Sequence, residues 1–448
     1  MSTDTYSPLS SAIRSAAQQL SGTAGDHDCL LDLIGDARFV LLGEATHGTH
    51  EFYEERARIT QRLISEKGFT AVAAEADWPD AYRVNRFVRG QGDDADAAHA
   101  LDGFQRFPGW MWRNTDVVDF VGWLRAHNDA QPDGAKVGFY GLDLYSMFTS
   151  IEEVLRYLGQ VDPAAAREAR ERYACFDQYY DDSQRYAYAA GIGMSDTCER
   201  DVVQQLRELQ ERALDYMRRN GSDAADSFFY AEQNARLVVN AEEYYRTMFR
   251  RRVSSWNLRD RHMADTLDAL AGHLSRKDGT PAKIVVWEHN SHIGDARATE
   301  VSQMGEWNVG QLARERYGDS ARLIGFSTHD GWVTAASEWD GPAERKQVQP
   351  AISGSYEDVF HRAGIGRFML PLRGDSPARQ ALMEQRLERA IGVLYLPRTE
   401  RQSHYFHAQL PQQFDAVLHF DRTDAVQPLE TTSHWKSGEA PETYPVGV

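Results

Sequence analysis

A glutamate and a histidine stand directly after a short apolar run near the start of the chain. The run is Phe39–Leu42, and the residues that follow it read GEATHGT, which places Glu44 and His47 between two glycines. A carboxylate that holds one ring nitrogen of a histidine leaves the other nitrogen free to take a proton from water. The same pattern is also typical of an ordinary polar turn between a strand and a helix.

The helix predicted over Glu51–Glu66 points a permanent cation toward the same interior. Phe52, Arg56, Ile59 and Leu63 are spaced by four, three and four residues, so all four share one stripe of a helix. A guanidinium keeps its charge at any physiological pH, and a buried one therefore needs carboxylates or similar acceptors around it. We expect Arg56 to meet a carboxylate at the end of a strand.

A second carboxylate follows another apolar run. Glu75 closes the run Ala71–Ala74, and adjacent parallel strands would bring it to the same edge of the sheet as Glu44. In this interpretation Glu75 orients Arg56. The alternative is that Glu75 only caps the helix predicted over Trp78–Val88.

Two histidines three positions apart follow a third apolar run, Ile284–Trp287. One turn of chain would direct His289 and His292 to the same side, where the pair could bind a metal, activate water or donate to an oxyanion. A single histidine is more often structural, but a pair at a strand end is harder to explain in that way. The helical H-E-x-x-H pattern of zinc proteases is absent.

Weaker candidates lie in three loops. The segment Phe107–Asp116 carries two tryptophans that could wall a pocket, although a packed surface loop explains them equally well. One aspartate ends a further strand, and an arginine and a histidine precede the last strand in a histidine-containing loop that is more often structural. The candidates for substrate binding are Trp110, Trp112, Asp143, Arg401 and His404.

The elements that must position these side chains form an α/β pattern. Short apolar runs alternate with helical patterns in the first part of the chain, which predicts a mainly parallel sheet flanked by helices, with ligands beyond the carboxyl ends of the strands. The predicted strands are Phe39–Leu42, Ala71–Ala74, Val137–Tyr140, Ile284–Trp287, Leu323–Phe326, Val393–Leu396 and Ala416–Phe420.

Strand patterns disappear between about residues 146 and 275, where Arg, Glu, Ala and Leu dominate. We predict a helical insertion or lid (146–275) in a split α/β core (1–145 and 276–424), followed by a polar tail (425–448). The helices predicted in the insertion are Ser150–Leu158, Pro163–Tyr173, Asp196–Arg219, Ala225–Arg250 and Ser255–Leu274.

Composition narrows the classes of partner. The formal net charge of the 448 residues is −18, which argues against nucleic acid or an anionic membrane as the main partner. Three well-separated cysteines make a disulfide framework unlikely and suit a reducing compartment. The chain begins with no signal-peptide pattern and contains no apolar run long enough to span a membrane, so we expect a cytoplasmic protein. Serine-nucleophile and nucleotide-binding motifs are absent.

At these motifs the chain resembles the erythromycin esterase family, bacterial hydrolases that open macrolide lactones with water. The resemblance rests on GEATHGTHEF with Arg56, on AAEADWP and on VVWEHNSHIGDAR, and it extends over Arg38–Leu429. It implies a three-layer α/β/α core with a helical subdomain over the cleft. It also implies that His47 is the general base and Glu44 its partner, and that Arg56, Glu75, His289 and His292 complete the site.

The sequence departs from the family pattern at Glu288, where a small apolar residue is expected. This carboxylate could raise the pKa of His289 or ligate a metal, unless its side chain points to the other face of the strand.

The leading hypothesis is an ester or macrolactone hydrolase, with a possible role in macrolide resistance, that acts on a small-molecule substrate and needs no cofactor. His47 activates water, Glu44 orients it, and Arg56 and His289 stabilise the oxyanion. Two alternatives stay open. One is a metal-dependent hydrolase with His47, Glu44, Glu75 and one of the two later histidines as ligands. The other is a protein that binds a macrocycle or haem without turning it over.

Overall fold

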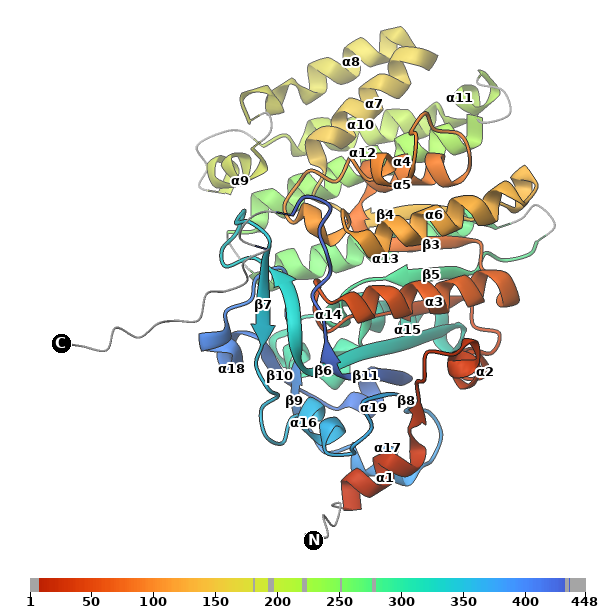
Figure 1. Cartoon of the computed structure of the whole chain (residues 1–448). Coiled ribbons are helices and arrows are strands. Elements are labelled where there is room, and N and C mark those ends of the chain that lie inside the picture. The colour runs from red at the N-terminus through yellow and green to blue at the C-terminus, as the bar shows by residue number, and fades with distance from the viewer. Residues whose placement is uncertain are drawn as a thin grey trace.

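A mostly parallel sheet between layers of helices forms the centre of the molecule. The computed structural model describes residues 8–179, 182–191, 197–219, 224–249, 252–275, 279–431 and 435. Figure 1 shows the strands side by side through the middle of the molecule, with helices packed around them. The predicted α/β class is confirmed.

The main sheet has nine strands in the order β1-β8-β11-β6-β2-β5-β3-β4, with β7 paired to β6. The strands from β11 to β4 are parallel, whereas β1, β7 and β8 pair antiparallel with their neighbours. The bounds are β1 Gln18–Gln19, β2 Phe39–Leu42, β3 Ala71–Asp77, β4 Gly138–Asp143, β5 Ile284–Trp287, β6 Ala321–Ala335, β7 Glu344–Val348, β8 Arg367–Pro371 and β11 Ala416–Thr423.

A separate antiparallel ribbon is formed by β9 (Arg386–Arg389) and β10 (Tyr405–Ala408). It lies near the end of the chain, before β11, and contributes one wall of the cavity described below. The sequence patterns gave no indication of this ribbon.

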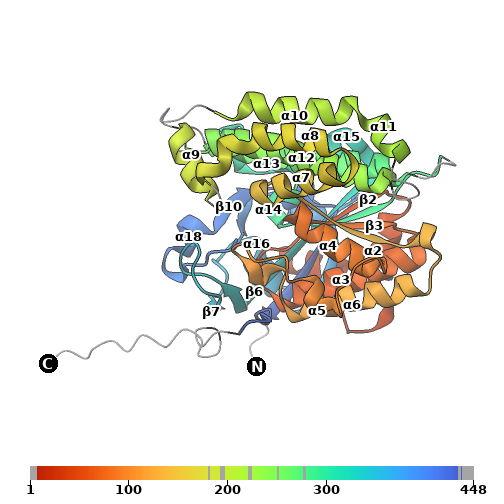
Figure 2. The same ribbon diagram turned by 90° about the horizontal axis from the view of Figure 1, so that it is seen from above.

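Helices cover both faces of the sheet. Figure 2 shows α13 and α15 on one side and α3 and α6 on the other. The helices outside the strand-free segment are α1 Pro8–Ala16, α2 Asp28–Ile34, α3 His50–Lys67, α4 Trp78–Val88, α5 Ala97–Ala100, α6 Thr115–Asp129, α14 Asn290–Ile293, α15 Val309–Tyr317, α16 Tyr356–His361, α17 Pro377–Ala381, α18 Glu400–Ser403 and α19 Leu410–Gln413.

Residues of β2 alternate between the two layers, as a strand buried on both faces requires. Phe39 and Leu41 join the apolar core that includes α13 and α15, whereas Val40 and Leu42 join the core that includes α3 and α6. The sheet therefore separates two apolar cores, which gives the three-layer arrangement.

Between β4 and β5 the described residues contain helices and no strand. The long helix α12 lies at the centre of this segment, in contact with α7, α9, α10 and α13. The helices are α7 Met147–Val161, α8 Pro163–Tyr173, α9 Ser183–Gly191, α10 Glu199–Glu211, α11 Ala213–Arg219, α12 Ala224–Thr247 and α13 Arg252–Leu274. We propose the residues before and after this segment as the two halves of one split core.

The helix predicted over Asp196–Arg219 is in fact two helices, α10 and α11, with Arg212 between them. Two predicted ends, Asp196 and Arg250, lie outside the described residues. The strand predicted over Val393–Leu396 is wrong, because only Leu394 of this run pairs, in an isolated bridge, and Pro397 follows it.

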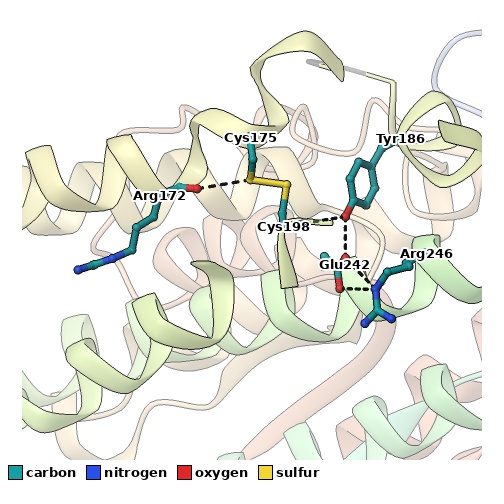
Figure 3. Close-up of a disulfide and its surroundings, with 6 residues drawn as sticks. All are labelled: Arg172, Cys175, Tyr186, Cys198, Glu242 and Arg246. Atoms are coloured by element: carbon teal, nitrogen blue, oxygen red, sulfur yellow. Dashed lines mark hydrogen bonds and ion pairs between the residues drawn. A yellow bond between two sulfur atoms is a disulfide. The ribbon is translucent and has the colours of Figure 1, made fainter. Parts of the chain in front are cut away.

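The expectation that the cysteines make no disulfide is also wrong. Cys175 and Cys198, 23 positions apart, are bonded, with their Cα atoms 6.0 Å apart. Because α8 and α10 pack against each other, the short helix η4 (Ala174–Tyr179) meets the start of α10. Figure 3 shows Tyr186 beside this bond, where it accepts the Cys198 backbone N–H and donates to Glu242.

The first residues of the predicted tail pack against the core. The Val426 N–H donates to the Gly48 carbonyl (2.9 Å), and Ala425 and Pro428 form isolated bridges with the loops before α3 and α6. Residues 432–434 and 436–448 lie outside the described residues. Within the described parts, no helix combines the length and the apolar character that crossing a membrane requires.

Candidate active site

The carboxyl ends of β2, β3, β4 and β5 meet at one edge of the sheet, as expected for parallel strands. A cavity of about 490 Å³ opens there. Side chains from β3, β4, α13, the loop before α6 and the β9–β10 ribbon line it, together with His47, His289 and His292. Its volume falls in the range of small-molecule sites.

His47 is held by Glu44, and Glu44 is held by Arg56. Glu44 Oε1 lies 2.8 Å from His47 Nδ1, and Glu44 Oε2 lies 2.7 Å from Arg56 Nη2. Arg56 is fully buried and stacks against Tyr53 and Trp287. A carboxylate at Nδ1 fixes the tautomer whose Nε2 is unprotonated and free to act as a base.

The expectation that Glu75 orients Arg56 is wrong, and the order of the sheet explains why. β5 lies between β2 and β3, so Glu75 is one strand further from Arg56 than adjacent strands would place it. Arg56 also does not line the cavity, so its contact is with Glu44 and not with a substrate.

The turn around His47 depends on close backbone approach. A Cβ on Gly48 would overlap the Thr334 carbonyl, and a Cβ on Gly43 would overlap the Asn290 side chain. The Asn290 N–H donates to the Glu44 carbonyl (2.8 Å), which ties the loop after β2 to the loop after β5. Both glycines are therefore required by packing.

The His289 ring lies beside the His47 ring at the cavity, with their centroids 4.7 Å apart. Its Nδ1 accepts the Ser291 backbone N–H (3.2 Å), which places the proton of the neutral ring on Nε2. Burial, with His47 as a further cause, holds the pKa of His289 well below its usual value. Among the described residues, no side chain accepts from Nε2, and the nearby Ala45 backbone offsets only part of the lowering. His289 is thus a neutral donor beside the candidate base.

His292 lines the same cavity as His289, as expected, but its ring nitrogens contact different partners. Its ring stacks on Trp256 at 4.6 Å, with Nδ1 3.0 Å from Asp260 and Nε2 3.4 Å from Glu75. Burial and the Arg259 charge lower the pKa of His292, but the Asp260 and Glu75 carboxylates outweigh them and raise this pKa to about 10. Both ring nitrogens are occupied by protein groups.

Arg259 of α13 joins the carboxylates at two strand ends. Its Nη2 lies 2.7 Å from Glu75 Oε1 and 2.7 Å from Asp143 Oδ2, and its Nη1 lies 3.0 Å from His292 Nε2. Burial raises the pKa of Glu75, yet His292 and Arg259 together hold it well below its usual value. The helical segment therefore supplies part of the site.

The sequence analysis did not identify Arg259 and Asp260, although the spacing of residues in their helix indicates a buried polar position. Trp256, Asp260, Met263 and Leu267 repeat the spacing of four, three and four residues that identified Arg56. Asp260 is fully buried on this stripe, and its neighbour Arg259 reaches the cavity from the flank of the same helix.

A second arginine was also missed. Arg106, in the loop before α6, pairs with Asp77 at 2.9 Å, and its guanidinium lies over the Tyr145 ring at 4.7 Å. Arg259 lies over the same ring at 4.9 Å. Tyr145 thus connects the loop before α6 with the helical segment at the cavity wall.

Glu288 does not line the cavity. Trp287, the preceding residue, donates to Thr60 of α3, so alternation directs Glu288 toward the opposite layer. Burial raises the pKa of Glu288 well above its usual value, and Glu75 and Asp260 add to that rise. Glu288 is therefore a buried neighbour of the ionic groups at the cavity and not a part of the cavity wall.

The residues predicted to bind substrate divide into two groups. Trp112, Asp143 and His404 line the cavity. Trp110 does not line it, because its side chain packs into the core beside α4 and α6. Arg401 is exposed on α18, and the described cavity wall does not include it.

The donor atoms near His47 are already engaged by other protein groups. Both Glu44 oxygens face cations or ring nitrogens, and both Glu75 oxygens accept contacts from Arg259 or the His289 backbone N–H. Within the described ranges, no group of three or more His, Cys, Asp or Glu side chains could hold a metal ion. The predicted alternative ligand set is therefore not assembled as a metal site.

Comparison with known proteins identifies relatives over most of the chain. The family model described as Erythromycin esterase matches residues 64–423. Erythromycin esterase type II of Escherichia coli is 22% identical over 416 residues, which cover 89% of this chain and 92% of that protein. The putative hydrolase YbfO of Bacillus subtilis is 23% identical over 417 residues, which cover 87% and 84%.

Solved structures share the fold. A succinoglycan biosynthesis protein matches with a TM-score of 0.77 and 21% identity, over 95% of this chain and all of that chain. An erythromycin esterase mutant in its open conformation matches with a TM-score of 0.67 and 18% identity, over 96% of this chain and all of that chain.

Proposed function

The chain belongs to the erythromycin esterase family of hydrolases, and we propose that it cleaves an ester or macrolactone with water activated by His47. The observation that carries the proposal is the contact of Glu44 with His47 Nδ1 at 2.8 Å beside a cavity. It leaves His47 Nε2 as the base. Positioned base catalysis contributes ~10²–10⁴-fold to a rate.

In the proposed reaction, His47 Nε2 takes a proton from water as the oxygen attacks the carbonyl carbon. The carbonyl π electrons move to the oxygen, and the His289 Nε2–H donates to that oxyanion. When the tetrahedral intermediate collapses, the C–O bond to the alkoxide breaks, and the proton on His47 passes to the leaving oxygen. The products are an acid and an alcohol, and His47 is restored.

Arg56 has a different role from the one expected for it. Because it is buried behind Glu44 and does not line the cavity, we assign Arg56 as a positioning residue that holds the Glu44 carboxylate in place for His47. We assign stabilisation of the oxyanion to His289. The Arg259 guanidinium contributes positive charge to the same cavity.

The substrate class is proposed from the cavity and the family name. The cavity combines the ionic groups described above with aromatic walls that include Trp112, Trp256 and Trp339, which suits an ester joined to a bulky apolar group. A macrolide is the first candidate, and inactivation of such an antibiotic would give a resistance role.

The test is incubation with a panel of macrolides and aryl esters, followed by mass spectrometry. The proposal expects products heavier than the substrate by one water, or the paired acid and alcohol. Turnover of none of these esters, or recovery of a bound ligand unchanged, would contradict it.

A further inference from the structure

A second group of buried acceptor atoms lies under the floor of the cavity, away from His47. It consists of Glu357 on α16, Glu388 on β9 and Gln413 on α19. Their exposed fractions are 1%, 3% and 1%, respectively. Three different elements thus bring two carboxyl groups and an amide into one buried place.

Each of these side chains has an oxygen without a partner. Among the described residues, Glu357 Oε2, Glu388 Oε2 and Gln413 Oε1 make no hydrogen bond. The remaining contacts are the Arg389 N–H to Glu357 Oε1 (2.8 Å) and Gln413 Nε2 to Glu388 Oε1 (3.5 Å). Buried acceptors without donors are costly, so such a set requires a proton or a cation.

The contacts also connect this group with the cavity. Glu388 is directly opposite Phe406 in the β9–β10 ribbon, so both side chains lie on one face of it, and Phe406 lines the cavity. Gln413 lines the cavity too, and its amide reaches Glu388. The group therefore adjoins the cavity through Gln413.

We propose that Glu357, Glu388 and Gln413 form a binding site for one compact monovalent cation, either an inorganic ion or the ammonium head of a bound ligand. Three oxygen acceptors are too few for calcium, which takes six to eight oxygen ligands. They suit an ammonium group, which has three or four N–H donors to share among acceptors.

The surroundings of Glu388 make a proton the competitor of the cation. Burial and the nearby Glu357 carboxylate raise the pKa of Glu388 well above its usual value. A proton and a cation therefore compete for the same acceptor group. Binding weakens as the pH falls, by up to about tenfold per pH unit while Glu388 titrates.

The test is thermal unfolding of the full chain in potassium, sodium or methylammonium chloride, with choline chloride at equal ionic strength as the bulky-cation reference. We expect a saturable rise in the midpoint with a compact cation, larger at pH 8.5 than at pH 6.5. The cation with the larger effect distinguishes an inorganic ion from an ammonium head.

Glu388→Gln should bind at least about tenfold more weakly, because it removes the charge and keeps the shape. Gln413→Met should also weaken binding. The matched control is Glu384→Gln, which removes the same charge from an exposed position just before β9. No shift relative to choline, or an equal shift in Glu388→Gln, would overturn the site. Ester hydrolysis is not measured here, so this result is independent of the proposed reaction.

Discussion

Arg259 and Glu75 are in contact at 2.7 Å although 184 positions separate them in the chain. This ion pair connects α13 of the strand-free segment with the end of β3. Asp143 at the end of β4 joins the same guanidinium, and Asp260 beside it holds His292. The helical segment therefore supplies part of the wall of the site through α13.

Removing the Arg259 charge should destabilise the protein. In Arg259→Met, Glu75 and Asp143 remain buried without their cation, and we expect the free energy of unfolding to fall by about 3–5 kcal/mol. Urea unfolding measures this free energy. The matched control, Arg261→Met, changes an exposed arginine of the same helix and should stay within about 0.5 kcal/mol of wild type. Equal losses in both variants would contradict the assignment.

The protonated form of His292 should stabilise the folded protein at neutral pH, and this stabilisation should be lost at alkaline pH. Its pKa is raised to about 10 in the folded protein, above the value of 6.5 for a free side chain. The contribution is complete below pH 6.5 and is lost as the pH rises toward 10. We expect His292→Gln to be less stable at pH 7 and to lose less stability than wild type between pH 7 and 10.

The control for this titration is His262→Gln, because burial lowers the pKa of His262 to about 4, outside the window. It should keep the pH dependence of wild type. Thermal melting curves at several pH values measure this difference. The same pH dependence of the melting temperature in wild type and His292→Gln would rule out a protonated His292.

Gly48 should not tolerate a side chain. In Gly48→Ala the new Cβ must displace the Thr334 carbonyl, and we expect a loss of about 1–3 kcal/mol together with displacement of His47. Gly122 of α6 has open space around its Cβ position, so Gly122→Ala should instead stabilise the helix by up to about 1 kcal/mol. Calorimetry of both variants tests this contrast.

Activity should survive removal of metal ions. The oxygens of Glu44 and Glu75 are engaged by protein cations and N–H groups, so we expect unchanged hydrolysis after dialysis against a chelator. Loss of activity with recovery on adding zinc or manganese would support the metal-dependent alternative.

Much of the site could be predicted because the carboxyl ends of parallel strands converge. Glu44, His47, Glu75 and His289 each follow an apolar run, and the fold brings them to one edge. The pairing of Arg56 was mispredicted because the sequence does not specify the order of strands. β5 enters between β2 and β3 from more than 200 positions later.

Two of the strands that were missed, β7 and β9, have patterns unlike those of the buried strands. β7 reads ERKQV and β9 reads RLER, because each pairs antiparallel at an edge or in a two-stranded ribbon with one face partly open. The disulfide was missed for a related reason: the two cysteines meet only because α8 and α10 pack against each other, and their spacing in the chain carries no such information.

The most direct test of the central claim is hydrolysis in water enriched in oxygen-18, with wild type and His47→Ala compared on any ester that the substrate panel identifies. The account predicts one labelled oxygen in the acid product and none in the alcohol, with a rate lower by about 10²–10⁴-fold in His47→Ala. Label in the alcohol, or a His47→Ala variant as fast as wild type, would contradict it.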